Sequence, residues 1–483
     1  TTMETDPILA QKSSSYSQKD AEVGIISKNE RIISKDANGD PELKEPSYYN
    51  LIRSNRPFRL YLLSYLTANI GLWLTYVASL STIATLYPRS YIRVAILVIL
   101  RLLPNFFASA LGGVLADYRD RRTSMIFLDL LGAIVALSYI LVIKTQSIML
   151  LYFLAFTQEC IDGFYEPVRS AIMPMFISND EYLLKANTLS GLTWSVMAAI
   201  GSGLGGYITT TLGMQGCFII DSLTYLLSAY LIWEIGGTWK ADNDLEEEKP
   251  AAMKNQSSWS LFSLSYYWDS FKTMFFEGLT YITSSSFGPL VLLKSSGSIL
   301  YGAYDVLNVA LSKVPDNAEE SNLRLSLIFS FVGIGCILGV TVGEYFIDVK
   351  KAESIQLMCI LSIGIISISS AGMGMFSSFE STCFFSLLRA SGSATLYIYS
   401  SLIIQMFTDE QLLGRVTSIE YALVTLFESA SALYAGIVFD VFQFSAQESC
   451  WGLFLLGSVI FCVWYYFNLN GGGLANDSVH TIT

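Results

Sequence analysis

The chain has 483 residues, of which 52% are hydrophobic and 14% charged, and its mean hydropathy is +0.47. An ordinary soluble domain carries about 25% charged residues, so this composition excludes a water-soluble globular protein and favours many membrane-spanning helices of about 20 residues each. The net charge of −12 gives no basic surface for nucleic acid.

Several classes of membrane enzyme are excluded by what the sequence lacks. The single histidine, His480, lies in a polar C-terminal tail, so no histidine-held iron centre is expected. The seven cysteines are scattered without a CxxC pair, which predicts neither a zinc site nor a disulfide framework. No Gly-Lys dipeptide is present, so the sequence has no Walker A loop for ATP. We therefore expect no cofactor, no metal and no enzymatic activity, and any uphill transport needs an ion gradient or an exchange.

Hydropathy divides the chain into tails, a linker and two sets of apolar segments. Residues 1–57 are polar and predict a disordered cytoplasmic tail, a hydrophilic linker covers 236–270, and a short tail follows at 470–483. The two remaining regions, 58–235 and 271–469, predict two six-helix bundles. Their apolar segments lie at about 60–86, 91–116, 123–143, 147–173, 187–212, 214–235, 287–311, 323–345, 353–375, 379–406, 413–438 and 449–469. The expected fold class is an all-α membrane protein with twelve transmembrane helices.

The distribution of Lys and Arg predicts the orientation in the membrane. Basic residues gather before the first span, in the loop at 119–122, in the central linker and in the loop that carries Lys350 and Lys351. The loops on the opposite side carry fewer of them. By the positive-inside rule, both termini are expected on the cytoplasmic side.

A short pattern recurs at equivalent places in the two sets of segments. After the fourth segment the chain reads Met175-Phe176 and then Asp180-Glu181, and a similar pattern with Asp409-Glu410 follows the tenth segment, 229 positions later. Repeats at one offset predict two parallel structural repeats, an arrangement typical of transporters.

The loop between the second and third segments carries a recognisable motif. It reads GGVLADYRDRR and resembles the signature loop of the major facilitator superfamily, in which Gly113, Asp117, Arg121 and Arg122 match. Tyr118 stands where a basic residue is usual, and Asp120 where a glycine is usual.

Further motifs are similar to those of one branch of this superfamily. Arg101-Leu-Leu-Pro104 precedes the loop, Glu166-Pro-Val-Arg169 ends the fourth segment, and Asp409 begins a run that ends in Gly-Arg-Val. Together they resemble enterobactin-exporter-like proteins, also called transmembrane secretion effectors, over about residues 55–468. The resemblance implies two helical bundles with alternating access around a central cavity, lined by spans 1, 4, 7 and 10. It also implies export of a small molecule, often by proton antiport.

Ionisable residues inside the fourth segment are the candidates for proton coupling. Glu159, Asp162 and Glu166 fall within an arc of about 80° on one helix. Charged groups at this depth cost at least about 2.5–3.5 kcal/mol, and two acids one turn apart cannot both ionise cheaply. The alternative is that these acids pair with Arg101 or Arg169 and hold helices together.

A second set of polar and aromatic residues is expected to line the substrate cavity. It comprises Asn69, Trp73, Tyr76, Lys294, Tyr301, Asp305, Arg389 and Tyr397. Two alternatives stay open: Lys294 pairs with an acid on a neighbouring helix, and Arg389 neutralises Glu420 or Glu428 rather than binding an anionic substrate.

The signature loop also predicts a conformational latch, formed by Gly113, Asp117, Arg121, Arg122 and Arg415. Asp117 ends the second segment on the side where the eleventh begins, near Arg415. A helix N-terminus favours a nearby acid by about 0.3–1 kcal/mol, so this contact is expected to close the cytoplasmic side. In the alternative, Asp117 only orders its own loop through Arg121.

These observations predict a secondary active transporter that exports a small organic solute, with protons as a further partner. It is expected to act as a monomer in a lipid bilayer and not to bind nucleic acid. Two alternatives remain: an uncoupled facilitator or importer, and a membrane receptor or scaffold that keeps the fold without transport.

Overall fold

The computed structural model describes residues 33–35, 41–43, 47–88, 90–177, 180–240, 275–347 and 351–470. Most of the expected tails and linker lie outside these residues, and so do some side chains within the helices, including that of Asp117.

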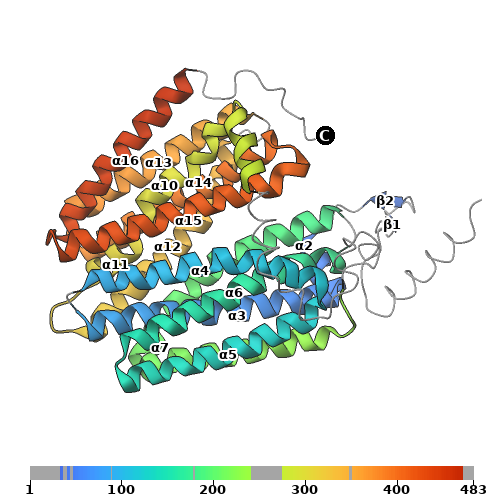
Figure 1. Ribbon diagram of the computed structural model, residues 1–483, viewed down its shortest axis with the longest axis horizontal. Helices are drawn as coiled ribbons and strands as arrows, with labels where there is room; N and C mark the ends of the chain where they lie inside the picture. The colour runs from blue at the N-terminus through green and yellow to red at the C-terminus, as the bar shows by residue number, and fades with distance from the viewer. Residues whose placement is uncertain are drawn as a thin grey trace, which may run out of the picture.

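Nearly all of the described chain is helical (Figure 1). Two short strands, β1 (Ile33–Lys35) and β2 (Pro41–Leu43), pair antiparallel ahead of the first helix. The helices are α2 (Tyr48–Ser54), α3 (Arg56–Leu86), α4 (Tyr91–Tyr118), α5 (Arg121–Thr145), α6 (Ile148–Phe176), α7 (Asp180–Ile235), α10 (Val291–Tyr301), α11 (Tyr304–Leu311), α12 (Ala318–Phe346), α13 (Ala352–Met375), α14 (Phe379–Phe407), α15 (Glu410–Asp440) and α16 (Ala446–Leu469). A 3-10 turn, η2 (Gly288–Leu290), precedes α10, and a short helix covers 275–284.

Helices cover all twelve predicted segments, with two differences in continuity. α7 is 56 residues long and takes in two predicted segments, because only Gly213 leaves the helical conformation, at φ 72° and ψ 173°. Glycine adopts such a backbone conformation without the strain that a side chain would add. The predicted segment 287–311 is divided into α10 and α11. Eight of the described helices are long and apolar enough to cross a membrane, so the count of twelve spans stays a prediction.

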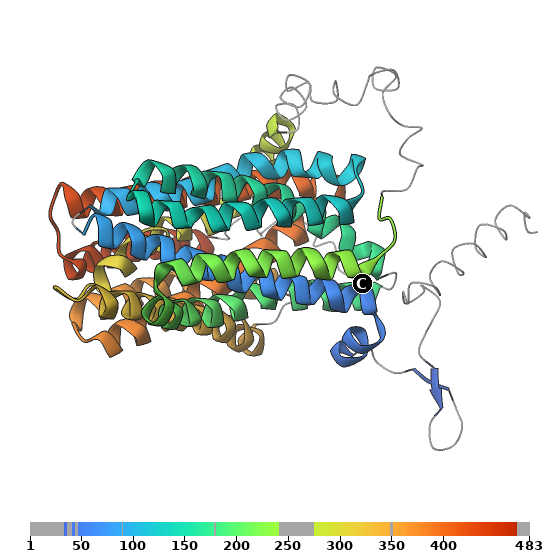
Figure 2. The same cartoon turned by 90° about the horizontal axis from the view of Figure 1, so that it is seen from below.

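The helices form two groups that lie side by side (Figures 1 and 2). In the N-terminal half, residues 48–240, α3 and α5 pack on α7, and α4 packs on α6. In the C-terminal half, residues 275–470, α12 and α13 pack on α14, and α16 packs on α13. The halves meet chiefly where α4 packs on α15 and α7 packs on α12. We call the end that carries the C-termini of α3, α11 and α15 the distal end, at the left in Figure 1, and the opposite end the proximal end.

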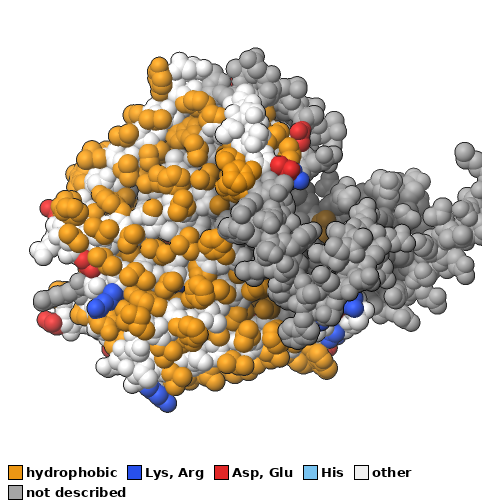
Figure 3. All heavy atoms as spheres, viewed as in Figure 1, with side chains coloured by type: hydrophobic (Ala, Val, Ile, Leu, Met, Phe, Trp, Pro, Cys, Tyr) orange, Lys and Arg blue, Asp and Glu red, His pale blue; other side chains and the backbone are white. Residues whose placement is uncertain are grey.

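The sides of the molecule are apolar. Figure 3 shows hydrophobic side chains over the sides of the helices and charged side chains near the two ends. On α5, for example, Phe127 and Ile134 are 64% and 63% exposed. Such a surface is stable in contact with lipid tails. The backbone N–H and C=O groups need no water there, because they are hydrogen-bonded within the helices. The chain is therefore an integral membrane protein with several spans.

Asp120 explains one departure from the signature loop. It is the N-cap of α5, and its carboxylate accepts hydrogen bonds from the backbone N–H of Thr123 (2.8 Å) and of Trp239 (2.5 Å). The N–H of Arg121 in turn donates to the carbonyl of Trp239 (3.0 Å). The acid therefore fastens the loop before α5 to the chain that leaves α7.

We predict that Asp120→Ala lowers the free energy of unfolding by about 1 kcal/mol at neutral pH, the usual cost of a lost N-cap. Partial burial raises the pKa of Asp120, but the hydrogen bonds from Thr123 and Trp239 outweigh this effect and hold the pKa below its ordinary value. The stabilisation is therefore complete above the unfolded pKa of about 3.9 and is lost as the pH falls through the lower, folded pKa.

Thermal unfolding of the purified protein at a series of pH values measures this difference. Glu319→Ala, which removes an exposed acid from the first turn of α12, serves as the control. A difference between wild type and Asp120→Ala that grows on acidification contradicts the assignment.

Candidate functional site

Several charged side chains are buried in the interior of the two halves. Among them, Glu159, Lys294, Arg389 and Glu420 are between 3% and 7% exposed. Charges in such surroundings need partners or access to water, so their partners indicate what the site can do.

Arg101 of α4 and Glu159 of α6 form an ion pair in the N-terminal half. Their nearest atoms, Nη2 and Oε1, are 3.0 Å apart, and the side chains are 10% and 9% exposed. The guanidinium of Arg101 also lies over the ring of Tyr76, 4.5 Å from its centroid. The sequence left two readings of Glu159 open, and the structure places it in the ion pair.

The other two acids of α6 have different surroundings. Glu166 forms an ion pair with Arg169 one turn away, and Arg169 also donates to the hydroxyl of Tyr61 (2.7 Å). Asp162 accepts a long hydrogen bond of 3.4 Å from the hydroxyl of Tyr225. In the described part of the chain Asp162 has no ion pair, although it lies within electrostatic reach of Arg101. Glu166 is therefore separate from the other two acids, whereas Asp162 still interacts electrostatically with Glu159.

Lys294 of α10 pairs with Glu420 of α15 in the C-terminal half. Lys294 Nζ lies 2.9 Å from Glu420 Oε1, donates to Ser401, and sits 4.2 Å from the ring centroid of Tyr397. Arg389 is therefore not the partner of Glu420, which was one of its expected roles. Its guanidinium instead lies over the ring of Tyr304, at 4.2 Å, and its Nε has no hydrogen-bond partner among the described residues.

Asp305 of α11 is the point where charged groups of both halves come together. The hydroxyl of Tyr76 on α3 lies close to the Asp305 carboxylate. Arg101 from the N-terminal half and Arg389 from the C-terminal half both act on it electrostatically, and so does Glu428 of α15. Partners from both halves are what an interior group needs if it is to sense their relative movement.

The remaining cavity candidates divide into two groups. Trp73 and Tyr76 pack on Phe329 of the other half, with ring centroids 6.2 and 5.5 Å apart, and so join Asp305 at the interface. Asn69, by contrast, donates to the carbonyl of Tyr65 on its own helix (2.8 Å). Tyr301 is half-buried, and its hydroxyl has no partner among the described residues.

The halves contact each other at the distal end and again about midway along α12. On α4 and α15, the rings of Tyr91 and Phe439 lie 4.6 Å apart. On α7 and α12, a Cβ on Gly333 would lie 2.3 Å from the backbone nitrogen of Ala199, so glycine is needed for this close approach. Near the proximal end lies an open groove of about 870 Å³, lined by Phe276, Glu277, Thr280, Tyr281, Ser284, Leu412 and Arg415.

The expected latch residues lie at the proximal end and contact their own halves. Arg415 forms an ion pair of 2.5 Å with Glu277. Arg121 donates to the carbonyl of Ala171 (3.0 Å), and Arg122 to that of Ile232 (3.1 Å). The side chain of Asp117 and the surroundings of Gly113 lie outside the described residues, so the expected contact of Asp117 with Arg415 stays a prediction.

Two buried acids were not among the sequence candidates. Asp221 of α7 accepts from the hydroxyl of Thr75 (2.5 Å), and Asp129 of α5 accepts from that of Ser228 (2.8 Å). Both are at most 1% exposed. An acid within an apolar segment was the available signal, but each of these two stands alone, whereas the acids of α6 were singled out as a group on one helix face.

We predict that Arg101→Gln or Glu159→Gln alone lowers the stability by about 3–5 kcal/mol, because either change leaves an uncompensated buried charge. The double variant, which removes both charges, should recover most of the loss. Thermal denaturation of the purified protein measures the cycle.

The exposed pair of Arg56 and Glu234, 2.9 Å apart with side chains 55% and 33% exposed, provides a matched control. Arg56→Gln should cost at most about 1 kcal/mol. Equal losses of stability for Arg56→Gln and Arg101→Gln would contradict the prediction, because breaking the interior pair would then cost no more than breaking an exposed one.

Two curated relatives come from Bacillus subtilis (strain 168), and both are described as uncharacterized MFS-type transporters. YkuC is 21% identical over 266 residues, which cover 55% of this chain and 58% of that protein. YfiS is 25% identical over 183 residues, which cover 38% and 43% of the two chains. The chain thus matches about half the length of these relatives.

Solved structures of transporters share the fold at low identity. A POT family transporter in complex with a thioalcohol conjugated peptide has a TM-score of 0.65 at 10% identity, and the match covers 86% of this chain and 96% of that one. The nucleoside transporter NupG has a TM-score of 0.61 at 13% identity, over 88% and 100% of the two chains. A bacterial homolog of the human lysosomal transporter Spinster, in an inward-facing conformation, has a TM-score of 0.59 at 12% identity, over 87% and 97%.

The sequence model of one transporter family covers most of the chain. The model described as transmembrane secretion effector matches residues 52–439. This match agrees with the fold and with the MFS-type relatives, which are transporters rather than enzymes. The protein therefore belongs to the transmembrane secretion effector family, within the major facilitator superfamily of membrane transporters.

Proposed function

We propose that this protein is a secondary active transporter that exports a small organic solute by alternating access, in exchange for protons. The observation that carries the proposal is the surroundings of Asp305: the hydroxyl of Tyr76 lies close to its carboxylate, and Arg101 of one half and Arg389 of the other act on it electrostatically. A group held from both sides changes its surroundings whenever the halves move, which is what couples binding to alternating access.

The substrate site is proposed to lie around Asp305 and Tyr76, with Trp73, Tyr301 and Arg389 beside them. Aromatic rings supply apolar contact area at low entropic cost, and a few convergent polar groups fix the orientation of a small molecule. The peptide conjugate and the nucleosides named for the structural neighbours are also small organic solutes, but of different chemical classes. The class of cargo is therefore best approached through the charge of this site.

Asp162 is the proposed proton carrier. Glu159 and Glu166 are tied to Arg101 and Arg169, whereas Asp162 accepts only the long bond from Tyr225 among the described contacts. Asp162 can thus gain and lose a proton without breaking an ion pair. The proximal end is proposed to face the cytoplasm, where Asp117 would contact Arg415 in the opposite conformation.

The first experiment is a thermal-shift screen of the purified protein against organic cations, carboxylates and neutral peptides. We expect one class to stabilise the wild type, and Asp305→Asn to abolish the shift at equal solute concentration. Glu380→Gln, an exposed acid in the first turn of α14, should keep it. An unchanged shift in Asp305→Asn would place the substrate elsewhere.

The second experiment uses the solute so found in proteoliposomes. An imposed pH gradient should drive accumulation by the wild type, and an uncoupler should abolish it. Asp162→Asn should lose at least about 90% of this accumulation but keep solute exchange at equal pH, because exchange needs no net proton movement. Accumulation that survives the uncoupler would indicate a facilitator, and binding without any movement of solute would indicate a receptor.

A further inference from the structure

The first turn of α4 is capped by a residue from the other half of the protein. Ser90 is the N-cap residue of α4, but its side chain does not cap the helix. Instead, the carboxylate of Asp440, the last residue of α15, accepts from the N–H groups of Tyr91 (2.8 Å) and Ile92 (3.0 Å). It also accepts from the hydroxyl of Ser90 (3.2 Å).

The contact combines two favourable effects. The first N–H groups of a helix have no partner within it, and the helix dipole adds partial positive charge at this end. A carboxylate that accepts hydrogen bonds from two of these N–H groups gives them partners and places a negative charge beside the positive end of the dipole. The close approach depends on Gly436, one turn before Asp440, because a Cβ at that position would lie 2.9 Å from the Cα of Ile92.

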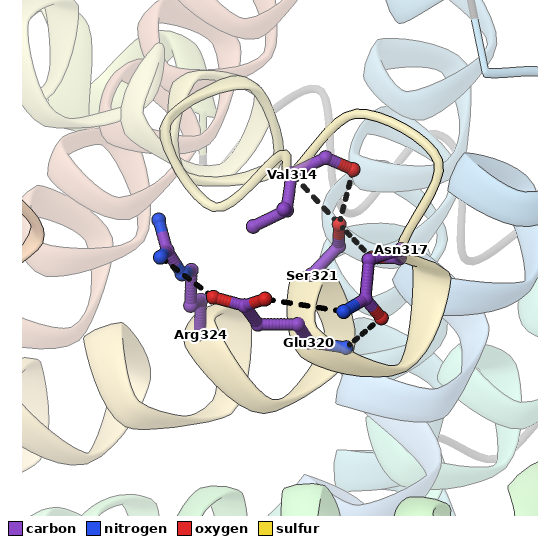
Figure 4. A network of polar contacts seen from close by, with 5 residues as sticks. All are labelled: Val314, Asn317, Glu320, Ser321 and Arg324. Carbon is purple, nitrogen blue, oxygen red and sulfur yellow. Dashed lines mark hydrogen bonds and ion pairs between the residues drawn. The ribbon is translucent and has the colours of Figure 1, made fainter.

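A second polar contact crosses between the halves at the same end. Nζ of Lys313 donates to the carbonyl of Pro88, just before α4, at 2.7 Å. The turn that follows Lys313 is held by a network shown in Figure 4, in which Arg324 binds Glu320 (2.6 Å) and Glu320 accepts from Asn317 (3.1 Å). The Lys313 contact therefore comes from a turn that is itself held in place by hydrogen bonds.

Helices α4 and α15 pack antiparallel, so each ends beside the start of the other. Asp440 ends α15 at the N-terminus of α4. Asp117 lies in the last turn of α4, at the end where α15 begins. Each acid thus lies at the C-terminal end of its own helix, beside the N-terminus of the other helix.

We propose that Asp440 is a distal latch, which holds the outer side closed, and that it alternates with the Asp117 contact during the transport cycle. The proposal rests on the alternating-access function proposed above. In one state Asp440 caps α4 at the distal end, and in the other Asp117 approaches the first turn of α15 at the proximal end. The N-terminus of each helix then donates hydrogen bonds to its partner's acid in turn.

Distances between spin labels in lipid nanodiscs test the exchange without any solute. Labels on Gln146→Cys and Ser378→Cys report the distal separation of the halves from exposed positions, with the exposed Cys462 replaced by Ser. Asp440→Ala should raise the ratio of distal-open to distal-closed molecules by about five- to thirty-fold, from the loss of a cap and a charge. Asp440→Asn, which keeps an acceptor, should give a smaller change in the same direction.

The sharpest arm is the combination with Asp117. Asp117→Asn alone should lower the distal-open population, and the double variant Asp117→Asn/Asp440→Ala should return the ratio to within about threefold of the wild type. A residue that merely stabilises the fold would not produce this compensation. Glu380→Ala, an exposed acid at the same end, should leave the distances unchanged.

Unchanged distal distances in Asp440→Ala, or a shift of Asp117→Asn in the same direction, would overturn the proposal. If Asp440→Ala fails to fold, Asp440→Asn decides by the direction of its shift. The populations are read without transport, so a protein that moves no solute but shows the compensating pair refutes the proposed function and keeps the latch.

Discussion

Charged side chains inside these apolar helices are costly unless a partner neutralises them, and the ion pairs that do so hold particular helices together. The ion pair of Arg101 with Glu159 joins α4 to α6, and that of Lys294 with Glu420 joins α10 to α15. Such pairs add little net stability compared with apolar packing, but breaking one is costly. They therefore contribute more to the register of these helices than to the stability of the fold.

The same requirement separates the interior acids by the work that they can do. An acid in a buried ion pair is committed to its partner, as Glu159 is to Arg101. Asp162 instead accepts a long hydrogen bond from the hydroxyl of Tyr225, and the hydroxyl of Tyr76 lies close to Asp305. A hydroxyl is a neutral partner that is exchanged at lower electrostatic cost than a full charge. The groups best suited to change state are thus those that the ion pairs leave over.

Much of the architecture could be predicted from the sequence, because long apolar segments leave a helix as the only way to satisfy the backbone in lipid. The signature loop indicated the family that the comparisons then showed. The continuity of α7 could not be predicted. A glycine such as Gly213 indicates a break between two segments, but not that helix resumes directly after it.

The partners of the interior charges were also out of reach of the sequence. Lys294 and Glu420 are far apart along the chain, and only the packing of α10 on α15 brings them within 2.9 Å. For Glu159 the sequence offered both proton coupling and an ion pair, and it could not choose between them. Asp120 appeared only as a departure from a motif, because its role depends on Trp239, which lies beyond α7.

The hydroxyl of Ser90 has a consequence for how easily the molecule can change shape. Serine is among the residues that most readily accept the first N–H groups of a helix, yet here it donates to Asp440. When the carboxylate withdraws, the hydroxyl of Ser90 is released and, as the N-cap side chain, can accept the N–H of Ile92 or Arg93. The exposed start of α4 then regains a local acceptor. This lowers the free-energy cost of breaking the Asp440 contact and therefore of opening the distal end.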